Sequence, residues 1–107
     1  MAEVVELSQQ GAVALVTINR PEALNALNGA VVDAFSAVLD RIEADSGIRA
    51  VVVSGEGRAF VAGADIAEMK DMSPLEAEAF SARAHRVFGR LEALPIPTIA
   101  AVNGFAL

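Results

Sequence analysis

The sequence contains no cysteine, tryptophan or tyrosine, and its only histidine is His85. The absence of cysteine excludes a disulfide framework, a thiol nucleophile and a metal site built on thiolates. A single histidine cannot supply a site of several imidazoles, and it argues against a Ser-His-Asp triad. We therefore expect no metal site in this chain.

Basic charge and long apolar runs are also scarce. The net charge is −6, so the chain lacks the basic excess with which nucleic-acid binders displace counterions. No apolar stretch approaches the roughly 20 residues that span a bilayer. The first ten residues resemble neither a signal peptide nor a transit peptide. We expect a cytoplasmic protein that has no membrane span and does not bind nucleic acid.

The 107 residues, of which 54% are hydrophobic, provide enough material for one domain. Hydrophobic patterns predict strands at residues 4–7, 13–18, 48–53 and 96–102, with a turn at residues 9–11. Asn28 is predicted to cap a helix that stops at residues 46–47. Ser73 and Glu76 are predicted to form a capping box for a second helix that ends before Pro95. The alternation of strands and helices predicts parallel pairing in an α/β fold.

Periodicity predicts which faces of these elements are buried. The first helix should bury Val31, Phe35, Val38, Leu39 and Ile42, which recur at helical spacing. The second helix should bury Leu75, Phe80, Ala84, Val87, Phe88 and Leu91. The strand at residues 48–53 lacks polar alternation, so we expect it to be covered on both faces. Asn103 and Gly104 are predicted to form a turn.

The loop at residues 55–69, GEGRAFVAGADIAEM, contains three glycines and no obvious nucleophile or base. Neither phosphate-binding glycine pattern fits, because no lysine follows Gly63 and Phe60 occupies the third glycine position of GxGxxG. The spacing of Asp65 and Glu68 predicts a capping box for a short helix. The backbone amides before that helix could stabilise a developing negative charge. The spacing leaves open a purely structural alternative, in which the glycines form a turn and Asp65 is only a cap.

Three stretches resemble the crotonase superfamily, the enoyl-CoA hydratase/isomerase family. They are TINRPEALNAL (residues 17–27), GRAFVAGADIAEM (residues 57–69) and PIPTIAAVNGFAL (residues 95–107). The resemblance implies the N-terminal half of a crotonase-type ββα spiral, the ClpP/crotonase-like fold. Residues 1–107 are then the N-terminal part of a single domain, and we expect a C-terminal remainder. The apolar ending at residues 105–107 supports the same expectation, because chain termini are usually exposed and polar.

The resemblance also implies the site residues. The amide of Ala64 should be one of two oxyanion-hole donors to a thioester carbonyl, and residues 64–67 should line the acyl-thioester site. The remaining CoA-facing positions should be Glu22, Ala23, Leu24, Arg58 and Ala62. Family members often have lysine where this chain has Glu22 and Ala67, so of these positions only Arg58 offers a cation to CoA phosphates.

The implied reaction is the addition of water to a 2-enoyl-CoA through an enolate-like intermediate, with a CoA thioester as substrate and no cofactor. The alternatives are a Δ3,Δ2-enoyl-CoA isomerase and a truncated, non-catalytic CoA-binding or interaction protein. The second oxyanion donor and the catalytic glutamates should follow Leu107, so residues 1–107 alone should be inactive. The resemblance further implies a homotrimer or hexamer for the full-length protein.

No acidic or imidazole side chain of this chain is predicted to be catalytic. Glu56 is assigned no catalytic role, and Glu68 is interpreted as a capping partner. The remaining glutamates considered are assigned to a solvated helix face: Glu76, Glu78 and Glu92. His85 is interpreted as a boundary residue of the second helix. Met69 and Met72 either line an acyl pocket, where flexible thioethers fill irregular space, or simply pack.

Overall fold

Four strands form the main sheet, in the order β1-β2-β3-β5. The computed structural model describes residues 3–107. β1 (Val5–Gln10) pairs antiparallel with β2 (Val13–Ile18), and β2 pairs parallel with β3 (Ala50–Gly55). β5 (Thr98–Ala100) pairs parallel with β3. The predicted α/β order with parallel pairing is therefore confirmed.

The hairpin between β1 and β2 is tighter than the sequence predicted. Gln9 and Gln10 lie within β1, where Gln10 pairs with Val13, so assigning them to the turn was wrong. Gly11 adopts a φ of 59°, a left-handed conformation that glycine reaches without a steric penalty. This allows the chain to reverse within residues 11–12, and the glutamine side chains remain on an exposed edge strand.

Helix α1 (Gly29–Glu43) crosses from β2 to β3 and supplies much of the core. The Asn28 side chain accepts a hydrogen bond of 2.9 Å from the Val31 amide, which confirms the predicted cap. The apolar positions predicted from its periodicity are all buried, together with Val32. The core therefore lies between this helix and the sheet.

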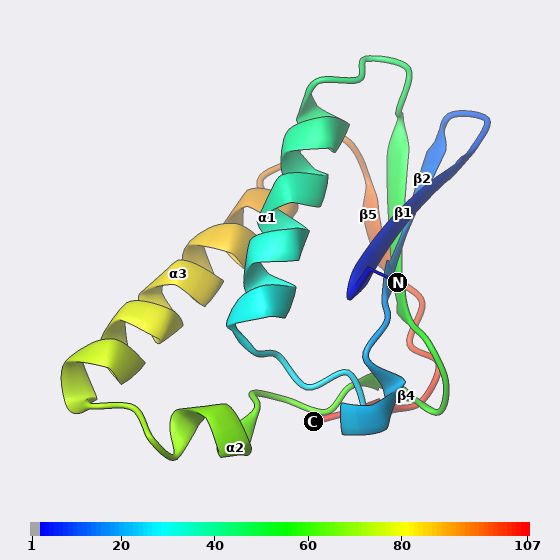
Figure 1. Ribbon diagram of the computed structural model, residues 1–107. Coiled ribbons are helices and arrows are strands. Elements are labelled where there is room, and N and C mark those ends of the chain that lie inside the picture. The colour runs from blue at the N-terminus through cyan, green and yellow to red at the C-terminus, as the bar shows by residue number, and fades with distance from the viewer. Residues whose placement is uncertain (1–2) are drawn as a thin grey trace.

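Helix α3 (Pro74–Glu92) crosses from the glycine loop to β5. Its capping box is present, with a bond of 2.9 Å from the Ser73 amide to Glu76 and one of 3.2 Å from the Glu76 amide to Ser73. Phe88 packs on Phe35 of α1, with ring centroids 5.1 Å apart. Leu75 is 78% exposed, so its predicted burial was wrong. The N-terminal half of α3 extends away from α1 (Figure 1), so its first turn lies beyond the part of α3 that packs on α1.

The two long helices lie on the same side of the main sheet (Figure 1). Val51 and Val53 of β3 are buried, whereas Val52 between them is only half-buried. The prediction that this strand is covered on both faces was therefore wrong for residues 3–107, because their long helices cover one face.

The last strand is also shorter than predicted, and Ile99 and Val102 are 51% and 57% exposed. No helix in the described part of the chain combines the length and apolarity that crossing a membrane requires.

Four short elements gather at one end of the molecule. They are the 3-10 helix η1 (Pro21–Ala23), β4 (Ala59–Val61), α2 (Ile66–Met69) and β6 (Phe105–Ala106). β4 and β6 pair in parallel as a separate two-stranded sheet. Figure 1 shows η1, β4, α2 and the C-terminal end of the chain at the same end of the molecule, below the main sheet. All three stretches that carry the family resemblance therefore contribute to one region.

Candidate functional site: the joint between two loops

A buried asparagine ties the first loop to the glycine loop. Asn25 is 0% exposed and has a φ of 59°, a left-handed conformation that asparagine tolerates better than most residues. Its Oδ1 accepts a hydrogen bond of 2.8 Å from the Arg20 amide. Its Nδ2 donates to the carbonyls of Glu56 at 3.0 Å and Ala59 at 2.9 Å. Every polar atom of this side chain is thus engaged, as burial requires.

Asn103 binds the same glycine loop from the opposite end of the chain. Its Oδ1 accepts from the Gly55 amide at 3.1 Å, and its Nδ2 donates to the Gly57 and Ala59 carbonyls at 3.0 and 3.2 Å. The sequence predicted a turn at Asn103 and Gly104, but the segment instead runs on from a bend into β6. The asparagine side chain joins that segment to the loop.

Gly104 allows this segment to pass directly over the loop backbone. A Cβ added there would lie 2.0 Å from the Arg58 carbonyl oxygen. We therefore expect Gly104→Ala to destabilise the protein by about 1–3 kcal/mol, because backbone atoms must move. Gly89→Ala is the matched control: a Cβ there meets nothing within 4 Å, and alanine in a helix should add up to about 1 kcal/mol. Equal denaturation midpoints for the two variants would contradict the assignment of a close backbone contact.

The first loop and the glycine loop meet at a short parallel joint. The Leu24 carbonyl accepts a hydrogen bond of 3.1 Å from the Ala62 amide. Further along, the Leu27 amide donates to the Gly63 carbonyl at 2.8 Å, and the Asp65 amide donates to the Leu27 carbonyl at 2.8 Å. In this pattern the residues on either side of Ala64 bind Leu27, so the Ala64 amide points away from Leu27. Among residues 3–107 the Ala64 amide donates no hydrogen bond.

Asp65 follows that amide and is held from two directions. Its Oδ1 accepts from the Glu68 amide at 3.3 Å, which confirms its role as the cap of α2. Its Oδ2 lies 2.8 Å from the Arg20 guanidinium, a contact that the sequence analysis did not predict. Arg20 lowers the pKa of the Asp65 carboxyl below its ordinary value, mainly through this hydrogen bond, while partial burial opposes the shift. The carboxyl is therefore anionic at neutral pH.

Glu68 does not complete the predicted capping box. Its Oε1 accepts a hydrogen bond of 2.9 Å from the Gly29 amide at the start of α1, rather than from the Asp65 amide. A carboxylate is favourable beside the N-terminal amides of a helix. The tertiary contact therefore takes this side chain away from its local partner, and it connects α2 to α1.

A cleft of about 450 Å³ opens beside Ala64. Leu27 and Met69 line it near the joint, and the rest of its wall comes from one face of α3, including Phe80, Ala84, His85 and Glu92. Met72 lies instead in a smaller neighbouring cleft of about 300 Å³ with Glu68 and Arg83. The structure thus places Met69, but not Met72, in the same cavity as the predicted oxyanion donor.

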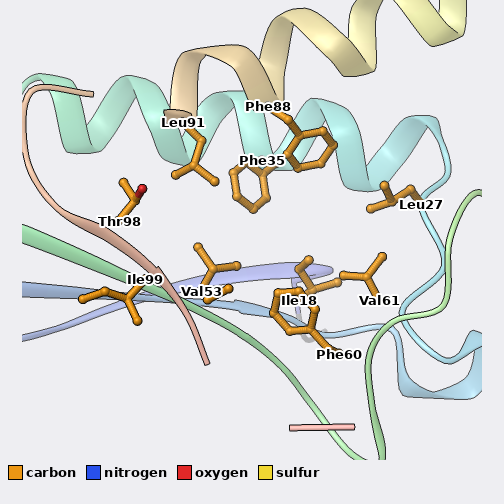
Figure 2. Close-up of a pocket in the computed structure, with 11 residues that line it drawn as sticks. Ile18, Leu27, Phe35, Val53, Phe60, Val61, Phe88, Leu91, Thr98 and Ile99 are labelled. Atoms are coloured by element: carbon orange, nitrogen blue, oxygen red, sulfur yellow. The ribbon is translucent and has the colours of Figure 1, made fainter. Parts of the chain in front are cut away.

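Another cleft, of about 350 Å³, shares Leu27 and Phe88 with the cleft beside Ala64. Figure 2 shows Phe35, Phe88 and Leu91 of the helices on one side and Ile18, Val53 and Ile99 of the strands on the other. Apart from Thr98, its lining side chains are apolar. The two clefts thus adjoin at Leu27 and Phe88, one between the helices and the sheet and the other beside the predicted oxyanion donor.

The other predicted site residues lie on both sides of the joint. Leu24 and Ala62 are hydrogen-bonded to each other, and Ala23 precedes them in η1. Glu22, Arg58, Ile66 and Ala67 are exposed, and Ile66 has 80% of its surface accessible. Ala64 and Asp65 lie at the joint itself, whereas no hydrogen bond or ion pair within residues 3–107 attaches the Arg58 side chain to it.

The acidic residues set aside in the sequence are exposed: Glu56, Glu68, Glu76, Glu78 and Glu92. Glu92 nevertheless lies at the rim of the cleft that contains Ala64, as does His85. The His85 Nδ1 is 2.8 Å from the Ser81 carbonyl oxygen, one helical turn earlier. This contact places the histidine on the helix surface, in agreement with its interpretation as a boundary residue.

The residues that organise the joint were missed by sequence reasoning. None of these residues has a role in the predicted reaction, although all three lie in the stretches that resemble the family: Arg20, Asn25 and Asn103. The only local signal was conformational, since asparagine favours turns and left-handed backbone. Their partners are up to 49 residues away, so spacing along the chain could not identify them.

Comparisons with known proteins agree with this architecture. The family model described as enoyl-CoA hydratase/isomerase matches residues 8–107. A short-chain-enoyl-CoA hydratase of Clostridium acetobutylicum is 53% identical over 104 residues, which are 96% of this chain and 40% of that protein. A crotonyl-CoA hydratase of Syntrophomonas wolfei is 44% identical over 110 residues, and the match covers 98% of this chain and 41% of that protein.

Solved structures show the same fold. A crystal structure of an enoyl-CoA hydratase from Bacillus anthracis has a TM-score of 0.90 at 28% identity and covers 94% of this chain and 40% of that one. The chain therefore spans about two fifths of the length of the relatives it matches. It has the N-terminal portion of the crotonase fold, as the quoted motifs predicted. With a family match over residues 8–107, the chain belongs to the enoyl-CoA hydratase/isomerase family.

Proposed function

We propose that this chain contributes the first half of the acyl-CoA site of an enoyl-CoA hydratase. In this proposal the Ala64 amide donates a hydrogen bond to the thioester carbonyl of a 2-enoyl-CoA. Water adds to the β-carbon and gives up a proton to a base, while the electron pair of the double bond moves toward the carbonyl oxygen as an enolate-like anion forms. Proton transfer to the α-carbon then re-forms the carbonyl and gives the 3-hydroxyacyl thioester. A backbone donor at that oxygen stabilises the anion without any reactive side chain.

The observation that carries the proposal is the free donor at the loop joint. The Ala64 amide has no partner within residues 3–107, and the residue lines an apolar cleft. Its neighbours are held in the Leu27 bridge, so the donor is fixed before any ligand arrives. A fixed donor needs no reorganisation when charge develops, and one such donor contributes roughly 3 kcal/mol to a transition state.

The position of Leu107 supports a second donor close by. Its amide donates to the Val61 carbonyl at 3.1 Å, and its carbonyl oxygen lies 3.5 Å from a Cβ position built on Gly63. A residue that followed Leu107 would therefore begin beside Gly63 and Ala64. The resemblance places the second oxyanion donor at that point, with the catalytic glutamates further along.

The test is turnover by the complete product of the gene that encodes this chain. We expect hydration of crotonyl-CoA, which is measured as the loss of the ultraviolet absorbance of the conjugated thioester. A chain restricted to residues 1–107 should show no turnover, because it lacks the predicted second donor and glutamates. Turnover of a 3-enoyl-CoA without hydration would favour the isomerase. An enoyl-CoA isomerase/hydratase of Penicillium crustosum is 41% identical to this chain over 107 residues. Binding of CoA thioesters without turnover would favour a non-catalytic binding protein.

We further propose that the complete protein assembles as a homotrimer or a hexamer. The proposal follows from the family resemblance. Residues 98–107 are exposed, including Phe105 at 53% and Leu107 at 88%, and we expect them to pair with the C-terminal remainder, so residues 1–107 alone should aggregate. Sedimentation of the complete gene product should give three or six times its chain mass, and a monomeric mass would contradict this proposal.

A further inference from the structure

We propose that Arg20 is a positioning residue for the oxyanion donor. This inference rests on the proposed function, and it concerns how the Ala64 amide keeps its direction. Arg20 precedes η1 and lies outside the set of residues predicted to contact the substrate. It acts through its neighbours rather than by touching the substrate.

The Arg20 guanidinium contacts both segments of the joint, the first loop and the glycine loop. Its Nη1 donates to the Ala26 carbonyl at 3.0 Å, and its Nη2 lies 2.8 Å from the Asp65 carboxylate. Ala26 immediately precedes Leu27, and Asp65 immediately follows Ala64. The planar group therefore connects the neighbours of Leu27 and Ala64, and the bridge between those two residues determines where the Ala64 amide points.

Arg20 is itself held in place by the buried cluster around Asn25. Its amide donates to the Asn25 side chain at 2.8 Å, and its carbonyl accepts from the Asn25 amide at 2.9 Å. The side chains of Arg20 and Asp65 are 19% and 14% exposed. The pair is thus partly shielded from water, and it should interact more strongly than an ion pair on an open surface.

The Asp65 carboxylate transmits this restraint to the peptide unit after Ala64. One oxygen binds Arg20 and the other binds the Glu68 amide at the start of α2. With both oxygens engaged, rotation of the segment around Ala64 would break one contact or the other. Lysine could not replace Arg20, because a single ammonium group lacks the fork that reaches a carbonyl and a carboxylate together.

The first test compares Arg20→Met and Arg20→Lys with the control Asp33→Asn in the complete gene product. Asp33→Asn removes the more exposed pair between Arg83 and Asp33, with side chains 41% and 66% exposed. We expect both Arg20 variants to lower kcat by about tenfold to a hundredfold, with KM changed less than about threefold, because a misplaced donor weakens the transition state. The control should retain the kinetics of the wild type.

Two further measurements separate positioning from general damage to the fold. Arg20→Met combined with Asp65→Asn should lose no more activity than the single variants, because residues that act as one unit are not additive. The absorption band of a bound aryl-conjugated enoyl-CoA should shift to longer wavelength in the wild type and shift less in the Arg20 variants. The inference would be overturned by additive losses of activity in the double variant. It would also be overturned if the band shifted as far in the Arg20 variants as in the wild type.

Hydrogen exchange decides the inference even if the proposed function fails. Inactive wild-type protein would reject the hydratase, but the joint can still be measured. Arg20→Met should then speed exchange of the Leu27 and Asp65 amides by about tenfold or more, whereas Asp33→Asn leaves it unchanged. Equal exchange in wild type and Arg20→Met would show that the guanidinium does not hold the joint.

Discussion

Replacing Ala64 by proline should lower kcat by at least about a hundredfold in the complete protein. Proline has no amide hydrogen, so this variant removes the proposed oxyanion donor. Loss of one such donor typically costs about a hundredfold to a thousandfold in kcat. The measurement is steady-state hydration of crotonyl-CoA, with a thermal unfolding curve for each variant.

Two matched variants show whether the amide itself is responsible. Ala64→Ser retains the backbone N–H and should keep kcat within a few fold of the wild type. Glu56→Gln alters an exposed carboxylate of the same loop and should leave activity almost unchanged, because this side chain has no proposed role in the reaction. If Glu56→Gln lost as much activity as Ala64→Pro, the oxyanion assignment would fail.

A backbone ester at position 64 distinguishes the loss of the N–H donor from the effect of the rigid proline ring. The ester replaces the Ala64 N–H by oxygen and keeps the side chain. Within residues 3–107 that N–H has no partner to lose, so the direct effect on the fold is limited to a weaker Gly63 carbonyl acceptor for the Leu27 amide. We expect the ester variant to remain folded and to lose kcat as proline does. An active ester variant would exclude the amide as the donor.

Replacing Asn25 by alanine should produce the largest loss of stability in this chain. The substitution leaves the Arg20 amide and the Glu56 carbonyl without their partner and takes one of two partners from the Ala59 carbonyl. Unsatisfied buried groups cost about 1–3 kcal/mol each, and alanine tolerates a φ of 59° poorly. We expect the unfolding free energy of the complete protein to fall by about 3 kcal/mol or more, which in a protein of roughly 150–250 residues corresponds to a melting point lower by about 6 °C or more.

Asn19→Ala is the control for Asn25. The Asn19 side chain donates one bond of 3.3 Å to the Glu3 carbonyl near the surface, so its removal should change the unfolding free energy by less than about 0.5 kcal/mol. Thermal denaturation followed by circular dichroism measures both variants. A melting point for Asn25→Ala close to that of Asn19→Ala would show that the two loops do not depend on this side chain.

The helices and their caps could be predicted because their causes are local. The apolar period of α1 and the side chains of Asn28, Ser73 and Glu76 act within a few residues of the positions they stabilise. Leu75 was misassigned for a tertiary reason: periodicity indicates a face of α3 but cannot tell where its neighbour α1 begins. Glu68 was misassigned in the same way, because the Gly29 amide, distant in sequence, took the place of its local partner.

The candidate site divides along the same line. The spacing within residues 55–69 was enough to predict Asp65 as a helix cap, and the resemblance to the family was enough to propose Ala64 as a backbone donor. Folding then brought Leu27, Arg20, Asn25 and Asn103 to that loop from both sides in sequence, which left the Ala64 amide unpartnered and its neighbours held. The physical reason is range: capping and periodicity depend on neighbours along the chain, whereas the direction of one amide depends on backbone pairing that only the tertiary structure creates.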